Sequence, residues 1–183
     1  MPSGFGKVKR VNIVQDPRST SRNLNMYVLA ESDDGKFIAP TTQLKTNLKS
    51  WLERYRMIND SVDILDGKII NYGIEFEVIA ETSSNRFEVL NNCTKRLKEK
   101  LLNVAKEMGE PVYLTEIYKH LNSVPGVVDT TAVKLVNKTG GSYSSFNYEM
   151  DKNMSSDGRF LIIPADAVAD VLFSDDDISG VIK

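Results

Sequence analysis

The sequence predicts an α+β fold in which small antiparallel sheets carry helices packed on one face. Three observations predict it: a long strand pattern over residues 68–81, amphipathic helical patterns on either side of it over 42–56 and 85–108, and the order of the elements. That order is β-β-α-β-α-α-β, followed by an extended C-terminal arm with short strands. A chain of 183 residues is long enough to bury such a core without disulfides or metals.

The first part of the chain predicts two strands and a helix. Residues 7–14 have the loose alternation of apolar and polar positions that is typical of strands, and a second strand is expected over 24–31. Thr41 or Thr42 then offers a side-chain oxygen that can cap a helix. The helix predicted over 42–56 places its apolar side chains on one face, and these are Leu44, Leu48, Trp51, Leu52 and Tyr55.

The strand over 68–81 is the centre of the second predicted domain. Its apolar side consists of Ile70, Tyr72, Ile74, Phe76, Val78 and Ala80, and its polar side contains Asn71, Gly73, Glu75 and Glu77. Asn85 and Glu88 match a capping box at the start of a helix that runs to about Met108. The predicted apolar face of this helix consists of Leu90, Cys93, Leu97, Leu101 and Val104.

A short helix, a turn and a strand complete this domain. The helix over 115–122 ends before Pro125, because the residue that precedes a proline is disfavoured in the α region. Pro125 and Gly126 form a turn that leads into a strand over 127–137. The predicted domains are an N-terminal α+β subdomain over 1–66, a second α+β subdomain over 67–138, and the C-terminal arm over 139–183.

The arm begins after Gly140-Gly141 and contains three aromatic residues without a core period, Tyr143, Phe146 and Tyr148. Tyrosine suits an interface because its ring is apolar and its hydroxyl can stay hydrogen-bonded at the rim. We expect the three to dock on a neighbouring subunit, and the alternative is a surface loop over 142–158 that folds back on the same core. Short strands are expected further along, at 160–163 and 168–173.

The residue types in the chain predict no enzyme. His120 is the only histidine, so every histidine-dependent triad or metal site would need it, and a helix surface is its expected place. Cys93 has a core-facing helical position, where a thiol behaves as a small hydrophobe. Asp33-Asp34 and the run at 175–177 match no calcium loop and are expected to be solvated. We expect no catalytic residue, no cofactor and no metal.

Charge and composition exclude further classes of protein. The chain has 25 acidic and 23 basic residues and a formal net charge of −2, whereas a nucleic-acid binder gathers an excess of bases on one face. We therefore expect no specific nucleic-acid binding, and solvated basic faces on both long helices. No stretch is apolar enough to span a membrane, and a single cysteine gives no sign of an oxidising compartment, which predicts a cytosolic origin.

Three stretches carry a family resemblance: GKIINYGIEFEVIAE, NRFEVLNNCTKRLKEKL and LTEIYKHLNSVPGVVDTTAV. In this order they resemble the baseplate J-like family of contractile phage tails. Two more, LKTNLKSWLERYRMINDSVDILDGKIINYGIEFEV and NKTGGSYSSFNYEM, are similar to the C-terminal part of the baseplate wedge proteins of T-even-type phages. Pro125 and Gly126 match the family turn, and the resemblance extends from about Lys7 to the end of the chain.

The resemblance implies a non-enzymatic structural protein of the virion that oligomerises in the inner ring of a tail baseplate. Its implied partners are other copies of itself, other wedge proteins and the sheath-initiating subunit. Its implied place is the tail baseplate, after assembly in the host cytoplasm. The family has no active-site residues to transfer. The alternative from another class is an independent α+β module that binds a protein or peptide.

Overall fold

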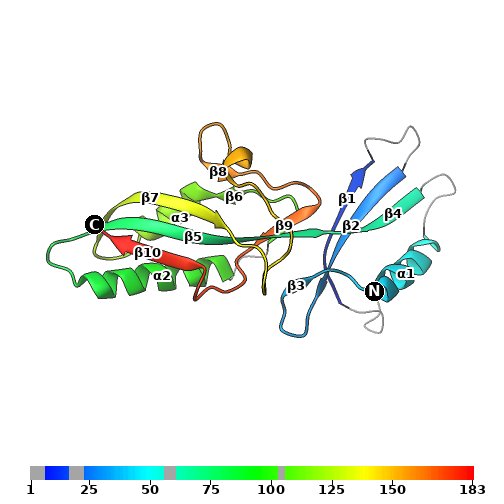
Figure 1. Cartoon of the computed structure of the whole chain (residues 1–183), viewed down its shortest axis with the longest axis horizontal. Helices are drawn as coiled ribbons and strands as arrows, with labels where there is room; N and C mark the ends of the chain where they lie inside the picture. Colours follow the sequence, from blue (N-terminus) through cyan, green and yellow to red (C-terminus); the bar gives the residue numbers. More distant parts are fainter. Residues whose placement is uncertain (1–6, 17–22, 56–60, 103–105) are drawn as a thin grey trace. The chain divides into compact units, whose positions relative to one another are not determined.

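The computed structural model describes residues 7–16, 23–55, 61–102 and 106–183 (Figure 1). They form two compact units. Unit 1 contains the described residues up to Ile69, with Glu107–Gly109 and Pro164–Val168, and unit 2 contains those of Ile70–Lys106, Glu110–Ile163 and Ala169–Lys183. The division into domains at 1–66, 67–138 and 139–183 stays a prediction, and the residues of the third range are shared between the two units.

Unit 1 is built on a four-stranded sheet with β2 (Asn23–Glu31) at its centre. The strand β1 (Val8–Gln15) pairs antiparallel with β2, and the short β3 (Phe37–Ile38) pairs antiparallel with its end. The edge strand β4 (Ser61–Asp66) pairs parallel with β2 and was not predicted. Its stretch carries two aspartates, a residue type that strands disfavour, and its partner is distant in sequence.

The helix α1 (Thr42–Leu52) begins at the predicted cap, because the Thr41 hydroxyl accepts a hydrogen bond from the backbone N–H of Leu44 at 3.2 Å. The predicted end at residue 56 is wrong. The N–H of Tyr55 donates instead to the carbonyl of Leu52 in a turn, and Tyr55 is 71% exposed rather than on the buried face. The apolar cluster of this unit is formed by Met26, Val28 and Leu48, with Val8, Trp51, Leu52, Val62 and Ile64 packed against them.

Unit 2 is centred on the long strand β5 (Lys68–Ala80), as the alternation predicts. The strand β7 (Val127–Asn137) pairs antiparallel with β5, and β10 (Ile178–Ile182) pairs parallel with it on the other side. The strand β9 (Ala167–Asp170) also pairs with β5 and overlaps the predicted strand at 168–173. The strand β10 follows directly on the acidic run and was not predicted.

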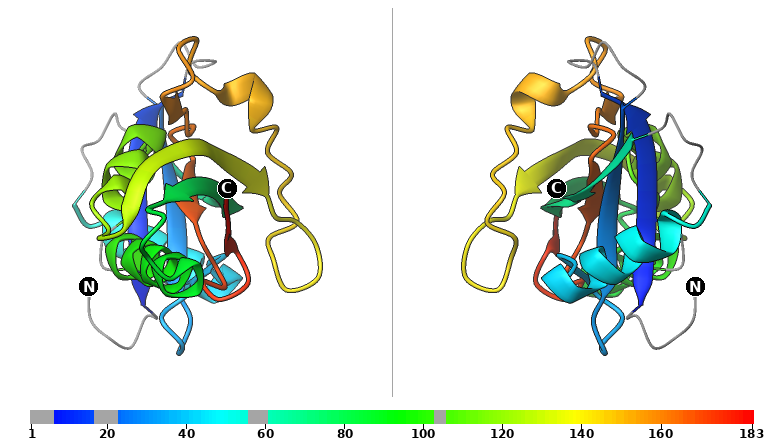
Figure 2. Two further views of the ribbon diagram at one scale, coloured as in Figure 1. Left: turned by 90° about the vertical axis from the view of Figure 1, so that its left-hand side faces the viewer. Right: turned by 90° about the vertical axis from the view of Figure 1, so that its right-hand side faces the viewer.

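Two helices, α2 (Arg86–Leu102) and α3 (Leu114–Asn122), lie on one side of this sheet (Figure 2). The Asn85 side chain accepts a hydrogen bond from the N–H of Phe87 at 3.1 Å, which confirms the predicted start of α2. The predicted end near Met108 is wrong, because 106–109 are not helical, and the predicted Val104 lies outside the described residues. The side chains at the centre of this core are Ile70, Ile74, Phe76, Val78, Cys93, Leu97 and Leu121.

The predicted α+β class, with small antiparallel sheets and helices packed on them, is confirmed. A third, two-stranded antiparallel sheet joins β6 (Val112–Tyr113) to β8 (Phe160–Leu161), where the sequence predicts a strand over 160–163. The two parallel pairings, β2 with β4 and β5 with β10, go beyond the prediction. Both involve strands that are far apart in sequence from their partners.

Candidate interface segment

Residues 138–150 follow β7 and contain the three aromatics predicted to dock on a neighbour. They belong to unit 2 and fold against its sheet, on the side away from α2 and α3 (Figure 2). The N–H of Lys138 donates to the carbonyl of Asn71 at 3.0 Å, and the N–H of Ser144 donates to the Asn71 side-chain oxygen at 2.8 Å. A single β5 residue therefore fixes this 138–150 segment at two points.

The tip of the segment is Gly140-Gly141. Their φ angles are +79° and +60°, in the left-handed region that glycine adopts without a steric cost. A Cβ atom built on either glycine would meet nothing within 4 Å. The tip is therefore specified by backbone conformation and not by packing.

Tyr143 contacts two residues near the C-terminus, Asp177 and Phe173. Its hydroxyl donates to Oδ1 of Asp177 at 2.7 Å, and its ring meets the ring of Phe173 edge-on with the centroids 5.4 Å apart. The hydrogen bond to Asp177, with a smaller contribution from burial, raises the pKa of Tyr143 to about 12. The phenol is thus a neutral hydrogen-bond donor throughout the physiological range.

Asp177 is the polar centre of this arrangement. Its side chain is 0% exposed, its Oδ2 accepts the N–H of Phe173 at 2.9 Å, and the Lys138 ammonium lies 3.8 Å from its Oδ1. The Asp177 carbonyl accepts the N–H of Ile74 at 2.7 Å. A buried carboxylate needs such partners, because an isolated buried charge is strongly destabilising. The prediction that the whole run 175–177 is solvated is therefore wrong for Asp177.

The other two predicted aromatics pack on each other. The rings of Phe146 and Tyr148 are stacked with centroids 6.2 Å apart. Tyr148 is only 8% exposed, and its hydroxyl donates to the carbonyl of Ile162 at 2.6 Å, whereas Phe146 is half-buried. Tyr148 thus belongs to the core of unit 2, and a docking role for any of the three stays a prediction.

Asn71 was assigned to the polar side of β5 but is 2% exposed. The period-2 pattern places it correctly on the face opposite Ile70 and Tyr72, and the 138–150 segment covers that face. Its Nδ2 atom, like Oδ1 of Asn137, has no hydrogen-bond partner among the described residues. A polar residue on a strand carries no sequence signal that distinguishes burial under a distant segment from exposure to water.

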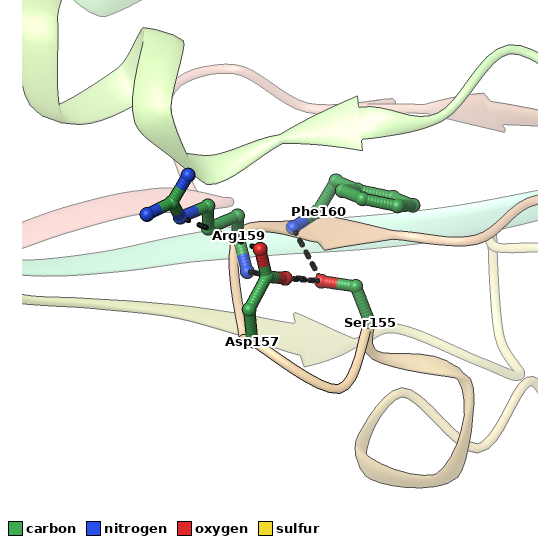
Figure 3. A network of polar contacts seen from close by, with 4 residues as sticks. All are labelled: Ser155, Asp157, Arg159 and Phe160. Carbon is green, nitrogen blue, oxygen red and sulfur yellow. Dashed lines mark hydrogen bonds and ion pairs between the residues drawn. The ribbon is translucent and has the colours of Figure 1, made fainter.

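The chain beyond the segment turns back through a compact polar network (Figure 3). The hydroxyl of Ser155 donates to Asp157 at 2.6 Å and accepts the N–H groups of Arg159 and Phe160 at 3.0 and 3.1 Å. Gly158 has a φ of +69° and donates its N–H to the Ser155 carbonyl at 2.8 Å. This network directs the chain into β8 and explains its serine, aspartate and glycine without a bound ligand.

The turn at Pro125-Gly126 has the geometry that its residues predict. The N–H of Val127 donates to the carbonyl of Val124 at 3.2 Å, and Gly126 has a φ of +86°. Proline before a glycine of positive φ is typical of a type II turn. A Cβ atom on Gly126 would lie 2.9 Å from a methyl carbon of Val89 and 3.0 Å from the Ser84 hydroxyl. The turn is therefore packed against the start of α2.

The residues considered for catalysis lie apart from the segment. Cys93 is fully buried in α2, and burial raises the pKa of its thiol to about 11. His120 lies in the last turn of α3. Among the described residues, no group of three or more histidine, cysteine, aspartate or glutamate side chains could hold a metal ion. None of the described helices combines the length and apolarity that a membrane crossing requires.

No family model matches the sequence, and no curated protein matches it. Among solved structures, the chain is similar to a chain in the cryo-EM structure of the six-fold symmetrised baseplate of the anti-feeding prophage. The TM-score is 0.52 at 13% sequence identity, and the match covers 89% of this chain. It covers 33% of that chain, so this protein corresponds in length to about a third of its structural neighbour. The two share a fold.

Proposed function

We propose that this chain is a non-enzymatic structural component of the baseplate of a contractile tail. The observation that carries the proposal is the likeness of fold to a baseplate chain over 89% of the sequence. The motif order, which resembles that of the baseplate J-like family with Pro125 and Gly126 at the family turn, supports the same function, and no family model matches the sequence. A shared fold alone is compatible with several functions, so the agreement of the two observations matters.

Within the baseplate, the chain acts as a wedge or inner-ring subunit. It contacts other copies of itself and the neighbouring wedge and sheath-initiating proteins, and it resides in the virion after assembly in the host cytoplasm. Repeated contacts between unlike faces of identical subunits close into a ring when the rotation per subunit divides a full turn. A ring subunit needs complementary surfaces and no catalytic group.

The 138–150 segment is the part of unit 2 that contacts the adjacent subunit. Phe146 is half-buried, the tip at Gly140-Gly141 has open space around it, and Tyr148 anchors the segment in the core.

A reconstruction of the tail particle that contains this chain tests the function. We expect several symmetry-related copies of the chain in the baseplate, with the 138–150 segment against a neighbouring protein. Particles with a complete baseplate that lacks the chain would contradict the proposal. A chain that stays monomeric at high concentration and binds no baseplate protein would favour the independent binding module.

The role of the segment is tested by Phe146→Ser, with Phe87→Ser as the matched control. Phe87 is an exposed phenylalanine on α2, outside the segment. We expect Phe146→Ser to reduce incorporation into particles while Phe87→Ser does not. Equal loss for both variants, or for neither, would contradict the assignment of the segment as the contact.

A further inference from the structure

The C-terminal half of α2 and the last turn of α3 carry several basic side chains. Arg96 and Lys100 are separated by four residues on α2 and therefore lie on one face of that helix. Lys119 and His120 occupy the last turn of α3, which packs beside α2 (Figures 1 and 2). We call these four residues the basic cluster.

The basic cluster carries an excess of positive charge, with Glu116 as the acidic residue beside it. Lys100 and Lys119 are exposed and Arg96 is half-buried, and none of the three forms an ion pair with a described residue. Burial, followed by the charges of Lys100 and Arg96, lowers the pKa of His120, although Glu116 opposes this effect. The charges of Lys100 and Arg96 on α2 thus act on a side chain of α3, the helix that packs beside it.

Local helix stability accounts for only part of this arrangement. A cation in the last turn of a helix is stabilised by the partial negative charge of the helix end, which applies to Lys100, Lys119 and His120. Arg96 lies further back on α2, and like charges four residues apart destabilise a helix. The neighbouring Lys98, by contrast, is compensated by an ion pair, because its ammonium lies 2.5 Å from the Asp175 carboxylate. The basic cluster is left without such a partner.

We propose that the basic cluster is a docking surface for an acidic segment of another protein chain. Carboxylates complement the guanidinium and ammonium groups, and exposed charges of this kind steer association and select partners. A nucleic acid fits less well, since a phosphate backbone requires an extended basic stripe and stacking aromatic side chains. Here Glu116 lies within the cluster, and the hydroxyl of the nearby Tyr118 is engaged by the N–H of Val133. The proposal is independent of the baseplate function.

The single histidine allows a direct test by NMR. The His120 ring signals need no assignment by mutagenesis, because the chain contains one histidine. We expect saturation with an oligo-aspartate peptide to raise the pKa of His120, since carboxylates beside the ring favour its protonated form. An unchanged His120 titration at saturating peptide would overturn the proposal. A single-stranded oligonucleotide that binds as tightly as the peptide would overturn the choice of an acidic protein segment.

Two double variants distinguish binding at the basic cluster from a general attraction between the protein and an acidic peptide. Arg96→Ala with Lys100→Ala should weaken peptide binding about tenfold, the effect of two partly exposed charges. The control, Lys134→Ala with Lys152→Ala, removes the same net charge from other elements of unit 2 and should leave binding unchanged. Equal weakening by both double variants would contradict a localised site. Circular dichroism checks that each variant keeps its helices, and alanine favours the helix at both α2 positions.

Discussion

The strand β5 and the 138–150 segment lie against each other in unit 2, and different interactions stabilise them. In β5 a row of alternating apolar side chains, from Ile70 to Val78, is buried. The segment buries two large side chains, Tyr148 and Met150, near its end, and the part before them is fixed by hydrogen bonds to Asn71 and Asp177. Many side chains of the strand bury apolar area, so no single one is decisive, whereas each hydrogen bond of the segment has no duplicate.

This difference decides how each region tolerates change. A periodic apolar face distributes its stabilisation over many side chains, so the strand keeps its place in the sheet when one of them is changed. A segment fixed by a few hydrogen bonds depends on each of them, because every lost partner leaves a buried polar group unpaired. The part of the segment before Tyr148 can thus be detached by single substitutions that leave the sheet intact.

The largest expected effect comes from Phe76→Ala in β5. Phe76 is 2% exposed, and its ring lies against Gly180 of β10, where an added Cβ would come within 2.3 Å of ring carbons. Removing the ring leaves a cavity, which lowers the free energy of unfolding by about 4 kcal/mol. Urea unfolding measures the loss. Glu75 lies on the opposite face of β5 and is exposed, so Glu75→Ala should change stability by less than about 0.5 kcal/mol. An equal loss at both positions would contradict the assigned faces.

Asp177→Ala should have the next largest effect and should detach the segment. It leaves the Tyr143 hydroxyl and the N–H of Phe173 without their acceptor and the Lys138 ammonium without its counter-charge. We expect a loss of about 3 kcal/mol in the free energy of unfolding. Faster amide exchange at Ser144, with β5 still protected, would show detachment. The adjacent, exposed Asp176→Ala is the control and should be nearly neutral.

Gly126→Ala tests the turn at Pro125-Gly126, which the sequence predicts from local residue types alone. The φ of +86° is unfavourable for alanine, and the new methyl would approach Val89 and Ser84. We expect a loss of about 1–2 kcal/mol from the backbone conformation alone. Thermal unfolding measures it. Gly140→Ala is the matched control, because it has a similar φ but open space around it, so the difference between the two isolates the packing contribution.

Much of the fold could be predicted because its signals are local. The alternation in β5 and β7 and the caps at Thr41 and Asn85 each depend on a few neighbouring residues. The strands β4 and β10 were missed because they are short and pair parallel with partners that lie far away in the chain. The ends of α1 and α2 were also predicted too late, since apolar spacing continues past the last hydrogen-bonded turn, whereas the predicted end of α3 at residue 122 is confirmed.

The candidate segment could be predicted only in part. Its composition indicates a region that does not follow a core period, and its glycines mark the tip. What the sequence does not reveal is the partner of each polar group: Asn71 resembles a solvent-facing strand residue, and Asp177 resembles its exposed neighbours. Only the tertiary arrangement brings Asn71, Tyr143 and Asp177 together.

Tyr143→Phe gives the smallest expected effect and isolates one hydrogen bond of the segment. The ring and its contact with Phe173 remain, and only the hydroxyl that donates to Asp177 is removed, at a loss of about 1 kcal/mol at neutral pH. Because the folded-state pKa of Tyr143 is raised to about 12 from its ordinary value of 10.0, its contribution is complete below pH 10 and disappears as the pH rises toward 12. Urea unfolding of both proteins at neutral and alkaline pH measures the gap between them, and the effects of other titrating groups cancel in this difference. If the difference in the free energy of unfolding between the two proteins stays constant across that pH range, the Tyr143 hydroxyl does not act as a donor to Asp177.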